Sequence, residues 1–113
     1  MDTSWLDGID AAVTVCDREG IILSLNERAI RMFREEGGSS LVGKSLFDCH
    51  PEKASEQIRR MLKEETSNTY TIEKNGKKKL IWQTPWRKDG QFAGLVEIAI
   101  PLPFDVPHFV RKP

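Results

Sequence analysis

The chain has 113 residues, 39% of them apolar, and its 17 Lys and Arg are balanced by 17 Asp and Glu. This length provides one domain with a single core, and the neutral charge balance argues against a nucleic-acid partner. No stretch approaches the ~20 consecutive apolar residues of a membrane helix, which excludes a membrane span. Residues 1–5 also lack the basic and apolar regions of a secretory signal, so we expect a soluble, cytoplasmic protein.

The first third of the chain predicts a β-hairpin followed by a helix. Residues 11–16 and 21–25 are rich in β-branched side chains and are joined by a polar connection that ends in Gly20. Asn26 suits the N-cap of a helix over residues 27–33, because its side chain can accept a bond from a free N–H at the helix start. Gly37 and Gly38 suit the end of this helix.

The remainder predicts a second helix and three strands. Pro51 fits a helix start, and Ala54, Ile58 and Met61 then recur at helical spacing. From residue 68 the period changes to two, and Asn75-Gly76 is a strong hairpin signal. Strands are expected over 68–74, 79–87 and 92–100, with Pro85 at an edge or bulge. This order predicts an α+β domain with one antiparallel sheet and helices packed on one face.

Residues at the joints between these elements resemble the PAS family. They are Asp17, Gly20, Ile22, Asn26, Ala29, Phe33 and the Leu41-Val42-Gly43 segment. The resemblance covers about residues 5–100, and it implies the PAS fold: a five-stranded antiparallel sheet whose helical side can enclose a small molecule. We expect residues 1–10 to form an N-terminal cap, residues 11–100 the PAS domain, and residues 101–113 a proline-spaced tail.

The resemblance leaves the cofactor unknown. Flavin is the weaker candidate, because Leu46 occupies the position of the reactive Cys in the light-sensing PAS subgroup, and Cys49 comes three residues too late. Haem is the stronger one, although Ile58 and its neighbours replace the usual haem-binding His. His50 is then the candidate ligand for haem iron or another metal, with the Cys49 thiolate as a second. Alternatively, His50 caps the following helix and Cys49 packs as a small apolar residue.

A pocket between helices and sheet is expected to have an apolar wall with a few polar groups. We predict that it is lined by Phe33, Cys49, His50, Ile58, Leu62, Tyr70, Trp82 and Thr84. The alternative for the strand residues is ordinary core packing. Glu97 interrupts an apolar strand and is expected to face water on the open side of the sheet, and Lys77, Lys78 and Lys79 are expected to form a solvated hairpin end.

These observations predict a sensory module that binds a small molecule or cofactor and signals through a homodimer or a partner protein. The alternative is a ligand-free dimerisation module that uses the open sheet face and the Trp5-Leu6 segment. No nucleophile can be paired with a base from the sequence, so we do not expect an enzyme. If the sequence is complete, it carries no output domain.

Overall fold

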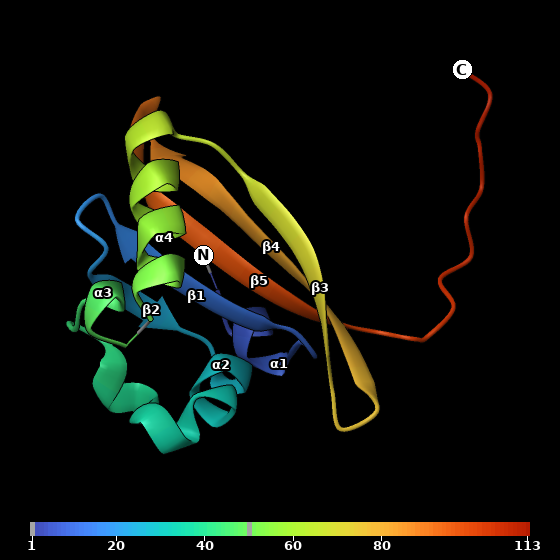
Figure 1. Cartoon of the computed structure of the whole chain (residues 1–113), viewed down its shortest axis with the longest axis horizontal. Helices are drawn as coiled ribbons and strands as arrows, with labels where there is room; N and C mark the ends of the chain where they lie inside the picture. Colours follow the sequence, from blue (N-terminus) through green and yellow to red (C-terminus); the bar gives the residue numbers. More distant parts are fainter. Residues whose placement is uncertain (1, 50) are drawn as a thin grey trace.

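A short helix precedes the first two strands, three strands close the chain, and the other helices lie between the two groups of strands (Figure 1). The computed structural model describes residues 2–49 and 51–113. The β-strands are β1 (Ala12–Asp17), β2 (Ile22–Leu25), β3 (Asn68–Lys74), β4 (Lys77–Lys88) and β5 (Gln91–Leu102). The α-helices are α1 (Trp5–Gly8), α2 (Glu27–Met32), α3 (Leu46–Cys49) and α4 (Glu52–Glu64), with 3-10 turns η1 (Arg34–Glu36) and η2 (Gly38–Leu41).

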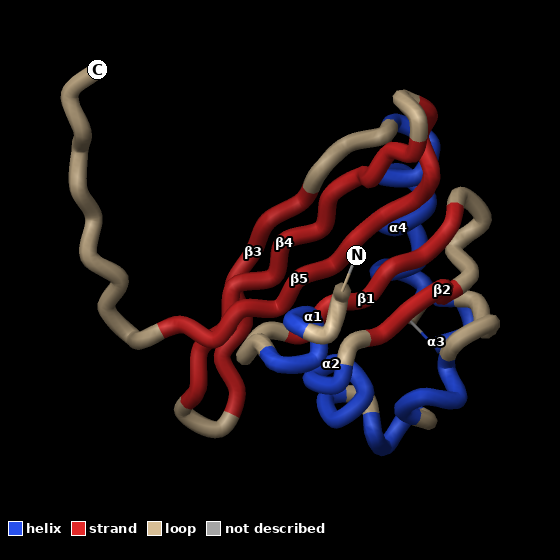
Figure 2. The backbone as a smooth tube through the Cα atoms, turned by 180° about the vertical axis from the view of Figure 1, so that it is seen from behind, coloured by secondary structure: helices blue, strands red, loops and turns tan. Residues whose placement is uncertain are grey.

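The strands form one antiparallel sheet in the order β2-β1-β5-β4-β3, so the strands from the two ends of the chain meet at its centre. Helices α2 and α4 lie on one face, and Figure 2 shows the sheet from the other side, with α4 behind it. The predicted five-stranded antiparallel α+β fold is confirmed. We call the face toward α2 and α4 the inner face and the opposite one the outer face.

Local chemistry fixes the turns between β1 and β2 and between β3 and β4. The Asp17 carboxylate accepts hydrogen bonds from the backbone N–H groups of Glu19 and Ile21, each at 2.9 Å, and Gly20 follows at a φ of 83°. The two-residue turn Asn75-Gly76 has positive φ at both positions, as a tight hairpin requires.

Asn26 caps α2 as predicted, and its side chain also forms hydrogen bonds with other segments of the chain. Its Oδ1 accepts from the backbone N–H of Ala29 at 3.0 Å and from that of Val13 at 2.9 Å. Its Nδ2 donates to the carbonyl oxygens of Leu6 at 2.6 Å and Ala11 at 2.9 Å. One buried side chain therefore joins the segment around α1, strand β1 and helix α2.

The core divides into two clusters. Under α2, the small residues Ala12, Ala29 and Ala99 pack with Ile81, which lets this helix approach the sheet closely. Under α4, the cluster consists of Cys16, Ile58, Met61 and Leu95. The two helices thus hold different parts of the inner face.

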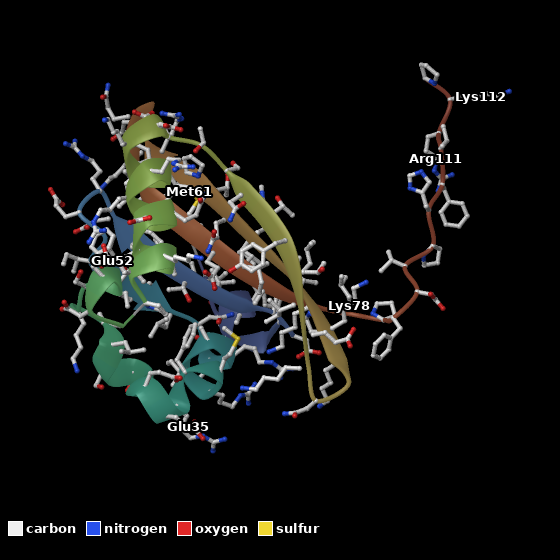
Figure 3. All side chains as sticks on the ribbon, viewed as in Figure 1. Glu35, Glu52, Met61, Lys78, Arg111 and Lys112 are labelled. Carbon is white, nitrogen blue, oxygen red and sulfur yellow. The ribbon has the colours of Figure 1, made fainter. Side chains whose placement is uncertain are left out.

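The end of the sheet differs in detail from the prediction. Strand β5 continues to Leu102, two residues past the expected end at Ile100. Pro85 lies beyond the last pair of β3 with β4, Asn68 with Gln83, so β4 is locally an edge strand there and pairs only with β5. The tail after Leu102 runs away from the domain, with Arg111 and Lys112 near its tip (Figure 3).

Candidate ligand cavity

A cavity of about 610 Å³ lies between helices α2 and α4 and the inner face of the sheet. This volume is within the usual range for small-molecule sites. Its apolar lining comes from both helices, the loops after α2, and the strands: Ile22, Leu25, Met32, Phe33, Leu41, Leu46, Ala54, Ile58, Met61, Ile72 and Ile81. On the β3 side, Tyr70 and Ile72 remain 43% and 42% exposed, so the cavity opens to solvent there.

The α4 wall follows from the helical period of the sequence. Ala54, Ile58 and Met61 line the cavity, and they recur every three or four residues, which places them on one side of the helix. Ile58 is 5% exposed and Met61 is 1% exposed. Figure 3 shows Met61 directed from α4 toward the sheet. Ile58 and Met61 also belong to the core cluster under α4.

The floor of the cavity carries a row of polar side chains. Asn68 Nδ2 donates to Gln83 Oε1 at 3.2 Å, and Gln83 Nε2 donates to Glu97 Oε2 at 2.9 Å. Strand register produces this row, since Asn68 pairs with Gln83 and Gln83 pairs with Glu97 across three neighbouring strands. We call Asn68, Gln83 and Glu97 the polar row. It ends in a half-buried carboxylate, which is an acceptor with room for further donors.

Burial affects two titratable groups near the polar row. It raises the pKa of the Tyr70 phenol, and the negative charge of Glu97 adds to this rise. Burial likewise raises the pKa of the Cys16 thiol; a backbone hydrogen bond at Leu95 opposes this, and nearby carboxylates reinforce it. At neutral pH, Tyr70 is therefore a neutral hydrogen-bond donor and Cys16 an unreactive thiol.

The structure brings three of the predicted pocket residues together. Phe33, Ile58 and Tyr70 all line the cavity. Leu62 instead packs beside the cluster under α4 and does not contribute to the described lining. The backbone of Cys49 ends α3, whereas its side chain and all of His50 lie outside the described residues.

The predicted placement of Trp82 and Thr84 toward the helices is wrong. Tyr70 pairs with Ile81, so Ile81 shares the inner face with Tyr70, and the side chains on either side of Ile81 point outward. Trp82 is 41% exposed on the outer face. The Thr84 hydroxyl lies 2.9 Å from that of Ser67, outside the cavity lining.

Glu97 also lies opposite to the expectation. It faces the helices and lines the cavity instead of facing water on the outer side. Sequence reasoning missed it, together with Asn68 and Gln83. The signal was available, because the pairing fixed by the Asn75-Gly76 turn places Asn68 opposite Gln83.

Comparison with known families identifies the fold. The sequence profile of the family described as PAS fold matches residues 6–102. The chain belongs to the PAS family. PAS domains are generally sensory and signalling modules, which agrees with the general class of function predicted from the sequence. A comparison with curated proteins found no match.

Several solved structures are similar to this chain at low sequence identity, which shows the fold alone. The Vibrio cholerae Aer2 receptor, described as a dual PAS-heme oxygen sensor, has a TM-score of 0.62 at 19% identity, covering 85% of this chain and 97% of that one. The PAS domain of Bordetella pertussis BvgS has a TM-score of 0.62 at 17% identity, covering 88% of this chain and 82% of that one. The structure of VqmA bound to DPO has a TM-score of 0.70 at 14% identity, covering 89% of this chain but only 56% of VqmA.

Neither a membrane-spanning helix nor a metal-binding cluster is found among the described residues. None of the helices in this part of the chain is long and apolar enough to cross a membrane. Within the same residues, no group of three or more His, Cys, Asp or Glu is arranged to hold a metal ion. His50, the predicted metal ligand, lies outside the described residues.

Proposed function

We propose that this PAS domain is a sensory module that binds a small organic molecule in the cavity between α2, α4 and the sheet. The polar row is the observation that carries the proposal. A sheet face that served only as core would hold apolar side chains at the Asn68, Gln83 and Glu97 positions, since burying polar groups costs free energy. Here these groups face a cavity large enough for a ligand.

The chemistry of the cavity indicates the kind of ligand. The Glu97 carboxylate accepts hydrogen bonds, so a ligand N–H or O–H group facing it would be favoured. The aromatic ring of Phe33 and the aliphatic Ile58 and Ile72 suit an apolar body. Structures of relatives support binding in this fold, since one is described as a dual PAS-heme sensor and another as bound to DPO.

The haem prediction depends on His50 and has a direct test. The described lining contains Met32, Met61 and Tyr70, whose side chains belong to residue types that ligate haem iron in other proteins, but it contains no histidine. An absorption spectrum of the purified protein would show a Soret band if haem is bound. Loss of that band in His50→Ala would support ligation by His50, and its retention would oppose it.

The first experiment identifies the ligand. Native mass spectrometry of the purified protein, followed by a thermal-shift screen of small molecules with N–H or O–H donors, should yield a bound compound. Ala54→Trp should abolish that binding, because an indole from α4 would occupy space in the cavity. If no compound binds wild type, or if Ala54→Trp binds equally well, the proposal fails.

Glu97→Gln should weaken binding of the identified ligand by about tenfold, because a charge-assisted hydrogen bond becomes a neutral one. Isothermal titration calorimetry measures this change. Glu73→Gln is the matched control, since Glu73 lies on β3 opposite Lys78 and is exposed outside the cavity. Equal affinities for wild type and Glu97→Gln would contradict recognition by this carboxylate.

A second proposal is that the outer face forms a homodimer. Strand alternation and register place apolar side chains from β1, β4 and β5 on this face: Val13, Val15, Leu80, Trp82, Val96, Ile98 and Ile100. Figure 2 shows this face of the sheet, with α4 on the far side. Contiguous apolar surface of this kind marks interaction sites. Trp82, 41% exposed among these aliphatic neighbours, has the character of a binding anchor. A signalling partner protein and a cytoplasmic location stay predictions.

Trp82→Glu should weaken the dimer by at least about thirtyfold, because a central tryptophan commonly contributes 2 kcal/mol or more to an interface. Analytical ultracentrifugation over a concentration series measures the dissociation constant. Val42→Glu is the control, because Val42 is 49% exposed but lies in the loop after η2. A wild-type chain that stays monomeric at all concentrations would overturn this proposal.

A further inference from the structure

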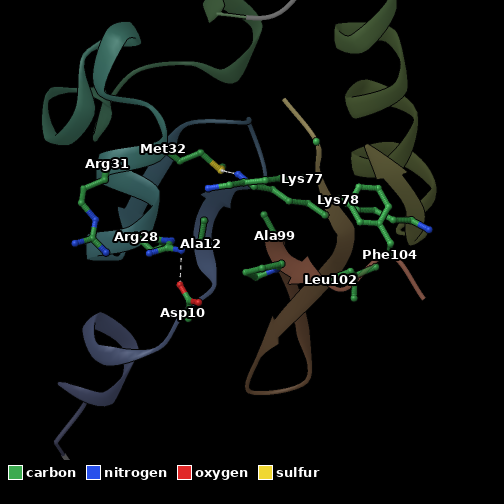
Figure 4. A pocket seen from close by; sticks show the side chains of 13 residues that line it. Asp10, Ala12, Arg28, Arg31, Met32, Lys77, Lys78, Ala99, Leu102 and Phe104 are labelled. Carbon is green, nitrogen blue, oxygen red and sulfur yellow. Dashed lines mark hydrogen bonds and ion pairs between the residues drawn. The ribbon is translucent and has the colours of Figure 1, made fainter. Parts of the chain in front are cut away.

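A second hollow, of about 590 Å³, lies beside the N-terminal end of β4 and is separate from the ligand cavity in most of its lining. Helix α2, the β3–β4 hairpin and the end of β5 surround it (Figure 4). Its apolar surface comes from Ala12, Met32, Ala99, Pro101, Leu102 and Phe104. We call it the basic hollow, for the charges described next.

Five basic side chains line the basic hollow: Arg28, Arg31, Lys77, Lys78 and Lys79. They come from α2 and from β4, which are far apart in the sequence and meet only in the fold. Asp10 is the one acidic residue in the described lining, and it forms an ion pair with Arg28 (Figure 4). A chain with no net charge therefore concentrates positive charge at one concave place.

Lys79 is the most informative of these residues. The Lys79 side chain extends from β4 to α2, where its Nζ lies 3.7 Å from the sulfur of Met32. A thioether is a weak acceptor, so this contact compensates little of the cost of holding a half-buried charge. Among the described residues, no carboxylate is paired with Lys79. Its position thus leaves an ammonium group available to an anion.

We propose that the basic hollow binds a small organic polyanion, which carries at least two phosphate or carboxylate charges on an apolar or aromatic body. The anionic groups would lie against Arg31, Lys77 and Lys79, where arginine and lysine can donate several charge-assisted hydrogen bonds. The body would pack on Phe104, which is 58% exposed and lines the hollow.

The concave shape favours a small molecule over nucleic acid or an acidic protein. A volume of about 590 Å³ suits a ligand of nucleotide size. A nucleic-acid backbone would instead require a longer basic strip. The apolar walls also have no role in binding a bare phosphate backbone. Met32 and Lys79 line both the basic hollow and the ligand cavity. The other residues of the basic hollow do not line the ligand cavity.

The test uses the whole chain labelled for backbone NMR and titrated with pyrophosphate, citrate, ATP and adenosine. ATP should bind most tightly, with a dissociation constant of about 1 mM or below, and pyrophosphate and citrate more weakly. Amide shifts should concentrate in α2 and in residues 76–79, and ATP but not pyrophosphate should shift Phe104. Binding should weaken with added salt. Uncharged adenosine should bind poorly.

Paired charge reversals decide whether the site is specific. Arg31→Glu combined with Lys77→Glu changes two exposed side chains of the basic hollow and should weaken ATP binding by at least about tenfold. Lys53→Glu combined with Lys88→Glu makes the same charge change at exposed positions outside it and should leave binding within about twofold. Equal losses in both variants, shifts spread over all basic residues, or binding only to DNA or an acidic peptide would overturn the proposal.

Discussion

Replacing Gly94 with alanine should destabilise the domain by about 3 kcal/mol or more, which ranks among the largest effects expected of a single methyl group. Gly94 lies in β5 at a φ of 147°, a backbone conformation that favours glycine. An added Cβ would overlap the carbonyl oxygen of Cys16 and lie 2.8 Å from backbone atoms of Asp17. The same carbonyl accepts a hydrogen bond from Trp86 Nε1 at 3.0 Å. The clash therefore affects three adjacent strands at the centre of the sheet.

Alanine substitutions at two other glycines separate the two contributions to the loss of stability, the steric clash and the backbone strain. Gly90 also has positive φ, at 79°, but nothing lies within 4 Å of an added Cβ, so Gly90→Ala should cost about 1 kcal/mol. Gly8 has open space and no positive φ, and Gly8→Ala should change stability by less than about 0.5 kcal/mol. Urea denaturation measures all three. If Gly94→Ala costs no more than Gly90→Ala, the close strand approach is not the cause.

The elements that sequence reasoning predicted well are those determined by local chemistry. Asp17 and Gly20 specify their turn through an Asx-type bond and a positive φ, and Asn75-Gly76 specifies a two-residue hairpin. Asn26 could be recognised as an N-cap for the same reason. Such features depend on a few neighbouring residues, so they can be read without the fold.

The inner face of β4 could not be assigned from the sequence pattern of the strand alone. That pattern predicts Trp82 and Thr84 toward the helices, as part of an apolar wall with a few polar groups, yet Ile81 occupies the inner face. Alternation in a strand defines two faces but does not say which is covered. The hairpin register supplied the missing constraint, since Tyr70 and Trp82 cannot share a face when Tyr70 pairs with Ile81.

The candidate site was only partly predictable because it combines distant segments. Phe33, Ile58 and Tyr70 were found from the PAS resemblance and from helical or strand periodicity. Glu97 and Gln83 meet only when β5 pairs with β4, and Lys79 meets Met32 only when α2 packs on the sheet. Polar residues at inner-face positions of neighbouring strands were the available signal for a cavity rather than a core.

Asn26→Ala should destabilise the domain by about 3 kcal/mol, because it removes four hydrogen bonds at a buried position. The Asn26 amide uses both lone pairs of its oxygen and both of its N–H groups, so none of its hydrogen-bonding positions is unused. Truncation would leave backbone groups of Ala11 and Val13 without this partner. Thermal and urea unfolding, compared with wild type, measure the loss.

Asn26→Asp distinguishes a cap from a structural tie. Asn and Asp are about equally good N-caps, so a residue that only capped α2 would tolerate this change within about 0.5 kcal/mol. The carboxylate has no N–H to donate, however, and would face the carbonyl oxygens of Leu6 and Ala11. We therefore expect Asn26→Asp at neutral pH to be nearly as unstable as Asn26→Ala. Asn75→Asp, in the exposed β3–β4 turn, is the control and should have little effect.

Loss of the Asn26 donors should also release the N-terminal segment. Leu6 is held by the 2.6 Å bond from Nδ2, and the segment that includes Trp5 leads directly into β1. Hydrogen exchange over residues 3–9 should accelerate in Asn26→Asp more than exchange in β4 does, because β4 keeps its pairing on both sides. Uniform acceleration would instead mean global destabilisation. A local release would show that the same amide that starts α2 also positions the segment predicted to take part in the dimer.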